Sequence, residues 1–583
     1  MSAKFLPMFH DEMNRLGWKE LDVLLVTGDA YVDHPSYGTA LIGRLLESRG
    51  YKVGIIAQPD WRKREDFIRM GRPRLCVLVS AGNVDSMVAN YTANKRLRRE
   101  DEYAPGGKAG KRPDRATIVY ANRVREVFKG LPLIIGGIEA SMRRLAHYDY
   151  WDDKVRRSLL LDAKADMLIY GMGEHPVVEV VDRLNKGRLV SAIRDVRGTV
   201  VVIKPDEVPA EAVVLPSFDD VCADHKAFNR AFELAYKEMS SRSGKPVVQA
   251  YGDRVVFQNP VAYPLTAEEI DQSYELPYAR RWHPSYDARG GIKGFETVRW
   301  SITVVRGCSA ECSFCGLAMH QGRVIQSRSE HSILHEARRI AKDPEFRGTI
   351  TDVGGPTANL YGASCVQWAK SGACRDKQCM MPGKCGSLKL GYDKCLSLYR
   401  SLRNVPGVKH VFVGSGLRYD LLLDKDAEEY FKELCQYHVS GQMKVAPEHT
   451  SDKVLRLMNK PPYARYEEFV AKFEQINAGL KDRRYLVNYF ITGHPGCGLN
   501  EAYDCATTLQ QRGMKPEQVQ DFIPLPMTVS ACLYYTGMHP FTGERVYVPK
   551  NLQEREMQRA LIQPQNARSG PFIVKARQIL GKQ

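Results

Sequence analysis

The sequence lacks any apolar run near the roughly 20 residues that span a bilayer, so we expect no transmembrane helix. The first twenty residues also lack the apolar core of a signal peptide and carry acidic side chains instead, which favours a cytoplasmic protein. Acidic residues are in deficit, with 68 Asp and Glu against 84 Lys and Arg and a formal net charge of +16. This charge would suit a phosphate-rich partner such as RNA, although the sequence contains no RNA-binding motif.

Cysteine is scarce in the first half of the chain, where Cys76 and Cys222 alone precede residue 300. Eight of the fourteen cysteines then fall between Cys308 and Cys395. Thiols of an unexported protein are kept reduced, so a dense run of cysteines indicates metal ligation rather than disulfides. The sequence therefore places the candidate metal sites in the second half of the chain.

The first 200 residues alternate apolar runs with helical patterns, which predicts a doubly wound, Rossmann-like α/β domain. The run Asn94–Arg115 interrupts it with eight Lys and Arg around a Pro/Gly-rich centre, and we expect an inserted surface loop there. The strands are expected at residues 21–27, 51–57, 74–80, 131–137 and 165–171.

The rest of the chain divides into three predicted parts. Residues 201–295 are less regular and are expected to form a connecting region. Residues 296–540 contain six strand-like runs, most followed by a helical pattern, which predicts a partial (β/α)6 barrel whose reactive loops follow the strands. Residues 541–583 carry eight Lys and Arg against three Glu and are expected to form a short helical, basic extension.

Cys308, Cys312 and Cys315 form a C-x₃-C-x₂-C pattern directly after the first strand-like run of this barrel. Three such thiolates can hold a [4Fe–4S] cluster and leave one iron open. An open iron can bind the amino and carboxylate groups of S-adenosylmethionine (SAM) and pass an electron to its sulfonium. The alternative is a zinc site that uses these cysteines and a remote histidine, but zinc loops usually need a second matching pair.

This pattern resembles the radical-SAM superfamily, and later loops agree with it. The resemblance implies that Gly354 and Gly355 expose backbone groups to the methionyl amine of SAM. It also places Ser415 and Gly493 at strand ends where SAM is bound, with Arg418, Glu448, His449 and His494 near them. The residue that acts on substrate is not identified.

Five runs together resemble the YgiQ family of radical-SAM proteins: HQGRVIQSRS (320–329), DVGGPTANLYG (352–362), GSGLRYD (414–420), KVAPEHT (444–450) and QDFIPLPMT (520–528). The resemblance covers nearly the whole chain. It implies an enzyme that reductively cleaves SAM to a 5′-deoxyadenosyl radical, with an electron donor such as flavodoxin or ferredoxin. The substrate does not follow from it.

A second cysteine group follows at x₈, x₄ and x₅ spacing: Cys365, Cys374, Cys379 and Cys385. Four thiolates in a Gly- and Pro-containing loop predict a fully ligated metal site. An auxiliary iron–sulfur cluster and a structural zinc are both compatible with this spacing.

The N-terminal region resembles the cobalamin-binding-like domain of many radical-SAM proteins. A histidine-ligated cobalamin uses an Asp-x-His-x-x-Gly loop, whereas Asp33 and His34 are adjacent here and the spacing to Gly38 is wrong. Bound cobalamin is therefore not expected but stays open, and Gly136 and Gly137 are candidate contacts only if a ligand binds. Two rival functions follow, a cobalamin-dependent radical-SAM methylase and a non-catalytic, metal-containing nucleic-acid-binding protein.

Overall fold

The fold is described from a computed structural model of residues 5–582. The first four residues of the predicted N-terminal domain and Gln583 of the predicted extension lie outside the described residues. The chain divides into two compact units. The first contains residues 5–299, 319–322 and 371–375, and the second contains residues 300–318, 323–370 and 376–582. The domain boundaries expected at residues 200 and 540 stay predictions.

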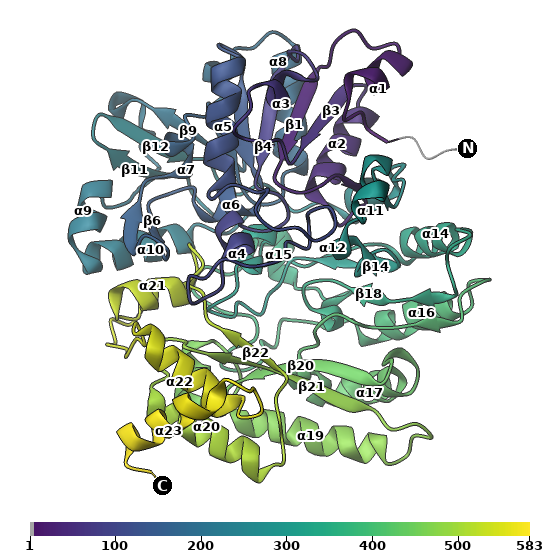
Figure 1. Ribbon diagram of the computed structural model, residues 1–583, viewed down its shortest axis with the longest axis vertical. Helices are drawn as coiled ribbons and strands as arrows, with labels where there is room; N and C mark the ends of the chain where they lie inside the picture. The colour runs from purple at the N-terminus through teal and green to yellow at the C-terminus, as the bar shows by residue number, and fades with distance from the viewer. Residues whose placement is uncertain (1–4, 583) are drawn as a thin grey trace. The chain divides into compact units, whose positions relative to one another are not determined.

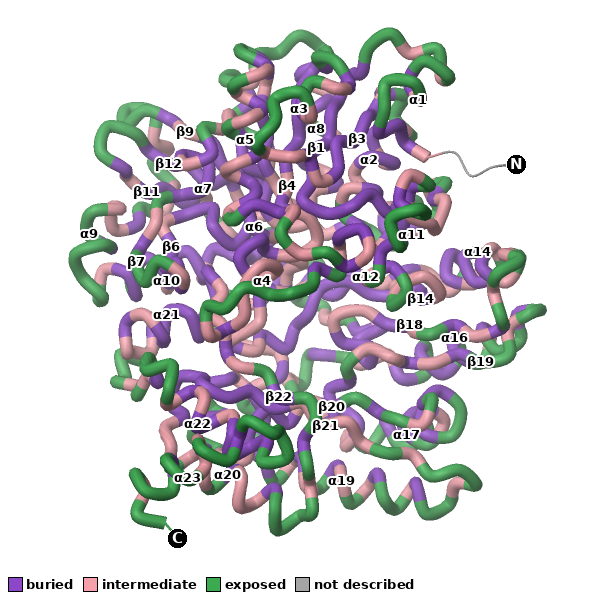
Figure 2. The backbone as a smooth tube through the Cα atoms, viewed as in Figure 1, coloured by how far each residue is buried: buried purple, intermediate pink, exposed green. Residues whose placement is uncertain are grey.

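The first unit contains a nine-stranded sheet, half of which is doubly wound. Five neighbouring strands run parallel, in the order β3 (Val53–Ala57), β1 (Val23–Thr27), β4 (Cys76–Ser80), β5 (Leu133–Gly136) and β8 (Met167–Ile169). β1 and β3 are buried along their whole length (Figure 2), as expected for apolar runs covered on both faces. This order confirms the Rossmann-like prediction and places the switch of strand order between β1 and β4.

Helices cover this parallel half of the sheet (Figure 1). α2 (Gly38–Ser48) packs against α8 (Glu174–Asn185), while α3 (Glu65–Ile68) packs against α5 (Ala116–Val127). α2 has its apolar residues at helical spacing and ends before Gly50, whose φ of 89° suits the left-handed turn after a helix.

The other half of the sheet is formed largely by residues from the segment 201–295, for which the sequence analysis expects a connecting region. β9 (Thr199–Ile203) runs antiparallel to β8, and the sheet continues through β12 (Arg254–Gln258), β11 (Val247–Tyr251) and β10 (Val213–Val214). β11 and β12 form a hairpin across Gly252, which has a φ of 63°. The signal was present in the sequence, since VVQAY and RVVFQ flank a two-residue Gly-Asp turn.

The second unit contains six parallel β segments in chain order, as the barrel prediction required. β14 (Ser301–Thr303) pairs with β18 (Asp352–Gly354), and β17 (Thr349–Ile350) pairs with β19 (His410–Val411). β20 (Gln442–Glu448), β21 (Tyr485–Thr492) and β22 (Gln518–Asp521) form a three-stranded parallel sheet, and a parallel bridge joins Leu417 to Val445 of β20. β15 (Val305–Arg306) follows β14 and pairs with β16 (Gln326–Ser327) in the antiparallel sense.

Helices separate the six segments of the second unit. They are α14 (Glu330–Ala341), α16 (Tyr392–Arg403), α17 (Glu428–Glu433), α19 (Tyr463–Asn477) and α20 (Leu499–Gln511). The expected helical extension consists of α22 (Leu552–Ile562) and α23 (Ser569–Leu580), which pack against each other, and α22 also packs against α20 and β22. Within residues 5–582, no helix combines the length and apolar character needed to cross a membrane.

Candidate functional site

The three cysteines of the C-x₃-C-x₂-C pattern lie in one short loop of the second unit, directly after β15. Gly307 starts the loop with a φ of 81°, and the N–H of Cys315 donates to the carbonyl of Cys312 at 2.9 Å before α13 (Leu317–Gln321) begins. The loop therefore turns back on itself at the carboxyl end of the first parallel strand. That end of a strand is where a β/α barrel carries its reactive groups.

Buried contacts fix the conformation of this cysteine loop. Glu311 has a φ of 51° and forms an ion pair at 2.9 Å with Arg323, and both side chains are almost fully buried. The side-chain amide of Asn459 donates to the carbonyls of Ala310 and Glu311 at 3.3 and 2.9 Å. Ser313 adds backbone hydrogen bonds to Met458 and Ser530, both 2.9 Å long. The loop is thus held in place without help from the thiols.

The three thiols lie within electrostatic reach of one another. Burial raises the pKa of Cys308, and the nearby Cys312 raises it further. Burial likewise raises the pKa of Cys315 to about 12, with Cys312 and then Cys308 as smaller causes. Cys308 is buried, and Cys312 and Cys315 are partly buried. Three close thiols of this kind suit a group that brings positive charge and takes each thiolate on a different iron.

Gly354 and Gly355 lie at the end of β18, against the strand that leads to the cysteine loop. A Cβ on Gly355 would come 2.4 Å from the carbonyl oxygen of Val305, and a Cβ on Gly354 would come 2.4 Å from the hydroxyl of Ser415. Ser415 is fixed by Asp352, which accepts hydrogen bonds from its hydroxyl and from its N–H. The structure therefore brings Gly354 and Ser415 together. Close packing alone already requires glycine at positions 354 and 355.

Thr357 follows the glycine pair, and its hydroxyl lies 3.6 Å from the sulfur of Cys308. Arg418 approaches from the loop after β19, with its Nη1 3.9 Å from the sulfur of Cys312. The sequence-predicted position Arg418 is thus next to the cysteines, and Thr357 is a neighbour that the sequence analysis missed. The signal for Thr357 was its place two residues after the Gly-Gly pair.

Gly493 lies at the end of β21, next to a histidine that contacts the cysteine loop. The ring of His494 is 6.3 Å from the ring of Phe314, and its Nε2 lies 2.7 Å from the hydroxyl of Ser530. A Cβ on Gly493 would meet Arg555 at 2.7 Å, and the N–H of Gly493 donates to Gln558 at 2.9 Å. α22 therefore covers this strand end, a role for the extension that its basic composition did not indicate.

Glu448 ends β20 with a φ of 67° and is buried. Burial raises its pKa, and Lys460, at 3.5 Å, and Arg418 oppose this effect. His449 points its Nε2 to the sulfur of Cys497 at 3.4 Å, and burial lowers its pKa to about 4. Glu448 therefore belongs to the polar group near the cysteine loop, whereas His449 is held by a buried thiol.

The second cysteine group is divided between the two units. Cys374 belongs to the first unit, while Cys365, Cys379 and Cys385 belong to the second. Within residues 5–582, no three His, Cys, Asp or Glu side chains are arranged to hold a single metal ion, so a zinc-like arrangement is not formed here. The pKa of Cys385 is lowered, mainly by a hydrogen bond from the backbone of Ser387 and further by Lys377. Metal binding by these four cysteines stays a prediction.

The β1–β4 switch point of the first unit is filled by an ion-pair group from the predicted insertion. Arg112 has no exposed side-chain surface and pairs with Asp29 at 2.8 Å and with Asp101 at 3.3 Å. The hydroxyls of Tyr37 and Tyr120 are buried and find no hydrogen-bond partner among residues 5–582. The insertion is therefore not purely a surface loop, since its Arg112 occupies this edge of the sheet, and the expectation that no cobalamin binds stays a prediction.

Asp33 and His34 also have structural partners. Asp33 is fully buried and forms an ion pair with Arg44, while Nδ1 of His34 accepts from the N–H of Ser36 at 3.1 Å. Burial lowers the pKa of His34 well below its usual value. Gly137 begins α6 (Gly137–Met142) with a φ of 83°, which explains this glycine by backbone conformation alone.

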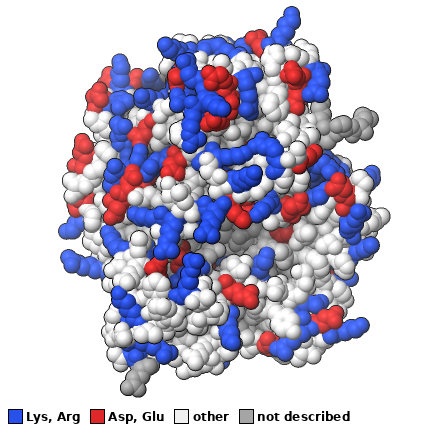
Figure 3. All heavy atoms as spheres, in the orientation of Figure 1, with Lys and Arg blue, Asp and Glu red and all other residues white. Residues whose placement is uncertain are grey.

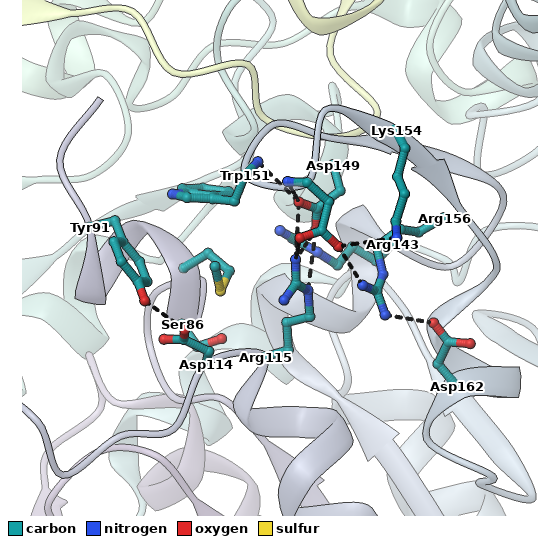
Figure 4. Close-up of polar contacts among 12 residues, drawn as sticks. Ser86, Tyr91, Asp114, Arg115, Arg143, Asp149, Trp151, Lys154, Arg156 and Asp162 are labelled. Atoms are coloured by element: carbon teal, nitrogen blue, oxygen red, sulfur yellow. Dashed lines mark hydrogen bonds and ion pairs between the residues drawn. The ribbon is translucent and has the colours of Figure 1, made fainter. Parts of the chain in front are cut away.

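A further polar cluster, which the sequence analysis missed, lies just after α6. Figure 4 shows Arg115, Arg143 and Arg156 around Asp149 of β6 (His147–Asp149); Arg115 precedes α5, Arg143 follows α6 and Arg156 ends β7 (Lys154–Arg156). Every one of these arginines has carboxylate partners, so the cluster is a structural network rather than an open anion site. The pairs are Arg115 with Asp149 (3.2 Å) and Asp152 (2.9 Å), Arg156 with Asp152 (2.7 Å) and Asp162 (3.3 Å), and Arg143 with Asp85.

Three known family models match this chain, and the boundary between the first two lies at residues 301–302, close to the boundary between the two units. Residues 5–301 match the family described as radical SAM N-terminal, residues 302–508 match the radical SAM superfamily, and residues 517–583 match a domain of unknown function. A UPF0313 protein of Methanocella arvoryzae is 50% identical over 569 residues, which are 98% of this chain and 94% of that protein. The chain belongs to the UPF0313 family, which is the YgiQ family of radical-SAM proteins.

Other members of the YgiQ family also match nearly all of this chain. A Clostridium botulinum UPF0313 protein is 50% identical over 96% of this chain and 87% of its own length, and one from Methanosarcina acetivorans is 47% identical over 100% and 81%. The YgiQ family therefore accounts for the whole chain, and its radical-SAM domain implies a [4Fe–4S] cluster and SAM.

Two solved structures show only a distant likeness. The methyltransferase TsrM from Kitasatospora setae, with cobalamin and a [4Fe–4S] cluster bound, is 13% identical over 87% of this chain and 74% of its own, with a TM-score of 0.48. OxsB with aqua-cobalamin bound is 10% identical over 98% and 63%, with a TM-score of 0.48.

Proposed function

We propose that this chain is a radical-SAM enzyme in which Cys308, Cys312 and Cys315 hold the [4Fe–4S] cluster. The observation that carries the proposal is the fixed loop that presents all three cysteines at the carboxyl end of the first parallel strand. When bound, such a cluster supplies the electron that cleaves SAM to methionine and a 5′-deoxyadenosyl radical, which abstracts hydrogen from a substrate. The substrate is unidentified, RNA is one candidate, and a flavodoxin or ferredoxin would supply the electron.

The chain's own residues position these partners. Gly354 and Gly355 would present backbone groups to the methionyl end of SAM, and Ser415 would keep β18 and the next loop together through Asp352. Gly493 and the segment under α22 would line the adenine end. The buried contacts of the cysteine loop would also limit the access of water, which would protect a radical from side reactions.

The cysteines at positions 365, 374, 379 and 385 would hold a second metal group. This group would be an auxiliary iron–sulfur cluster or a structural zinc. The proposed reaction does not use cobalamin, because Arg112 and its two aspartates occupy the β1–β4 edge.

Replacement of one ligand tests the proposal. We expect Cys312→Ala to lose the visible absorbance and bound iron of the triad cluster and to lose reductive SAM cleavage. The matched control is Cys222→Ala, because Cys222 is an exposed cysteine of the first unit. SAM cleavage at the wild-type rate in Cys312→Ala would refute the assignment. A wild-type protein that contains zinc alone and produces no 5′-deoxyadenosine would instead favour a nucleic-acid-binding protein.

A further inference from the structure

A buried arginine is held beside the sulfur of Cys312 by a carboxylate. Arg418 is 5% exposed, and its Nε and Nη2 donate to Asp420 at 2.9 and 2.7 Å. Its remaining terminal nitrogen, Nη1, lies 3.9 Å from the sulfur. The two-point contact with Asp420 fixes the plane of the guanidinium and therefore the direction of Nη1.

The backbone of Arg418 is anchored independently of its side chain. The N–H of Arg418 donates to Oδ1 of Asn359 at 3.1 Å, and Nδ2 of Asn359 donates to the carbonyl of Arg418 at 2.9 Å. A change of the Arg418 side chain therefore leaves the loop with its main attachment. The cysteine loop does not depend on the Arg418 side chain for its conformation, because Glu311 and Asn459 hold it in place.

We propose that Arg418 is a positioning residue that makes the triad cluster easier to reduce, with Asp420 limiting its effect. This inference rests on the proposed function, because it takes Cys312 as a cluster ligand. Reduction adds one electron from a one-electron donor protein to the cluster and so increases its negative charge. A cation next to a ligand sulfur stabilises that reduced state, and burial keeps the interaction from being screened by water.

The surrounding charges make the direction of the effect predictable. Asp420 neutralises part of the guanidinium charge, so loss of Arg418 and loss of Asp420 must shift the reduction potential in opposite directions. The other buried charges of this group, Glu448 and Lys460, lie 3.5 Å apart and largely cancel each other. A purely structural role for either residue would not produce shifts of opposite sign.

The experiment is an anaerobic redox titration of the full chain, monitored by electron paramagnetic resonance, first without SAM and then with it. We expect Arg418→Gln to lower the equilibrium constant for reduction of the cluster about tenfold. This corresponds to a reduction potential about 59 mV lower for a one-electron couple. Asp420→Asn should shift the potential the other way. Arg418→Lys should lie between wild type and Arg418→Gln, because it keeps the charge but not the two-point contact with Asp420. The matched control is Arg456→Gln, because Arg456 forms an exposed ion pair with Glu544 and should leave the potential unchanged.

The outcomes separate this inference from the proposed function. Failure of the wild-type chain to hold an iron–sulfur cluster would refute the proposed function itself. A cluster present at full occupancy, with unchanged potentials in both Arg418→Gln and Asp420→Asn, would overturn the role of Arg418 alone. A shift seen only when SAM is added would also overturn it, since that would indicate a contact with SAM. If Arg418→Gln loses the cluster, the sign of the Asp420→Asn shift decides the question.

Discussion

Gly354 is a position where packing and SAM binding can be separated by experiment. We expect Gly354→Ala to destabilise the second unit, because the new methyl group would lie 2.4 Å from the Ser415 hydroxyl and 2.8 Å from the Ser415 Cβ. Overpacking of this kind costs about 1–3 kcal/mol. Displacing Ser415 also breaks its hydrogen bond to Asp352, at a further cost of about 1 kcal/mol.

Removing the Ser415 side chain should relieve most of this strain. In Gly354→Ala/Ser415→Gly the alanine methyl group no longer meets the Ser415 side chain, although Oδ1 of Asp352 remains 2.9 Å away. We therefore expect a loss of about 2–4 kcal/mol in Gly354→Ala and recovery of more than half of it in the double variant. Ser415→Gly alone controls for the lost hydrogen bond.

The assay combines stability with SAM affinity. Hydrogen exchange of the β18 amides reports the local stability, and anaerobic equilibrium dialysis with labelled SAM reports binding. If Gly354 contacts SAM, as proposed, the double variant should recover protection but still bind SAM weakly. If it recovers both, glycine is required here for packing alone. Unchanged β18 protection in Gly354→Ala would refute the packing argument itself.

Two further predictions concern buried charges. Burial lowers the pKa of His449 to about 4 from its usual 6.5, so the folded state favours the neutral imidazole. The neutral histidine therefore stabilises the folded state fully above pH 6.5, and this stabilisation is lost as the pH falls toward 4. We expect about 2 kcal/mol of local stability at β20 to be lost between pH 7 and 5, and this dependence should vanish in His449→Gln; an equally steep profile in that variant would contradict the prediction. Arg112→Met should cost about 3–5 kcal/mol, because Asp29 and Asp101 would stay buried without a cation. Urea unfolding should show partial recovery when Asp29→Asn and Asp101→Asn are added, and the absence of any loss in Arg112→Met would contradict the ion-pair argument.

The parallel strands and the triad loop could be predicted from the sequence because their signals are local. The run at residues 21–27 is uninterrupted and apolar, and the structure forms β1 within it, buried along its length. The C-x₃-C-x₂-C spacing alone places three thiols in one turn. The β11–β12 hairpin was equally local, and it was missed because residues 201–295 were interpreted by their irregular composition.

Other features depend on contacts between distant residues. The basic run at residues 94–115 resembles a solvated loop, and only the folded chain shows that Arg112 is buried between Asp29 and Asp101. The cover that α22 forms over Gly493 depends on Gln558, 65 positions away in the sequence. The composition of a segment does not indicate which of its charges will meet a buried partner, so these interactions required the structure.

The partners of Arg418 distinguish it from Arg112 and Arg115 of the first unit. In the first unit, Arg112 and Arg115 each contact two aspartates, so their charge is balanced inside the protein. On the face shown in Figure 3, Lys and Arg lie among Asp and Glu, so the net charge of +16 does not identify a binding surface. Arg418 differs from both, because Asp420 holds its Nε and Nη2 while its Nη1 lies 3.9 Å from the sulfur of Cys312. Such a group can respond to added negative charge, and its position argues that the electron-transfer chemistry of this chain belongs to the cysteine loop of the second unit.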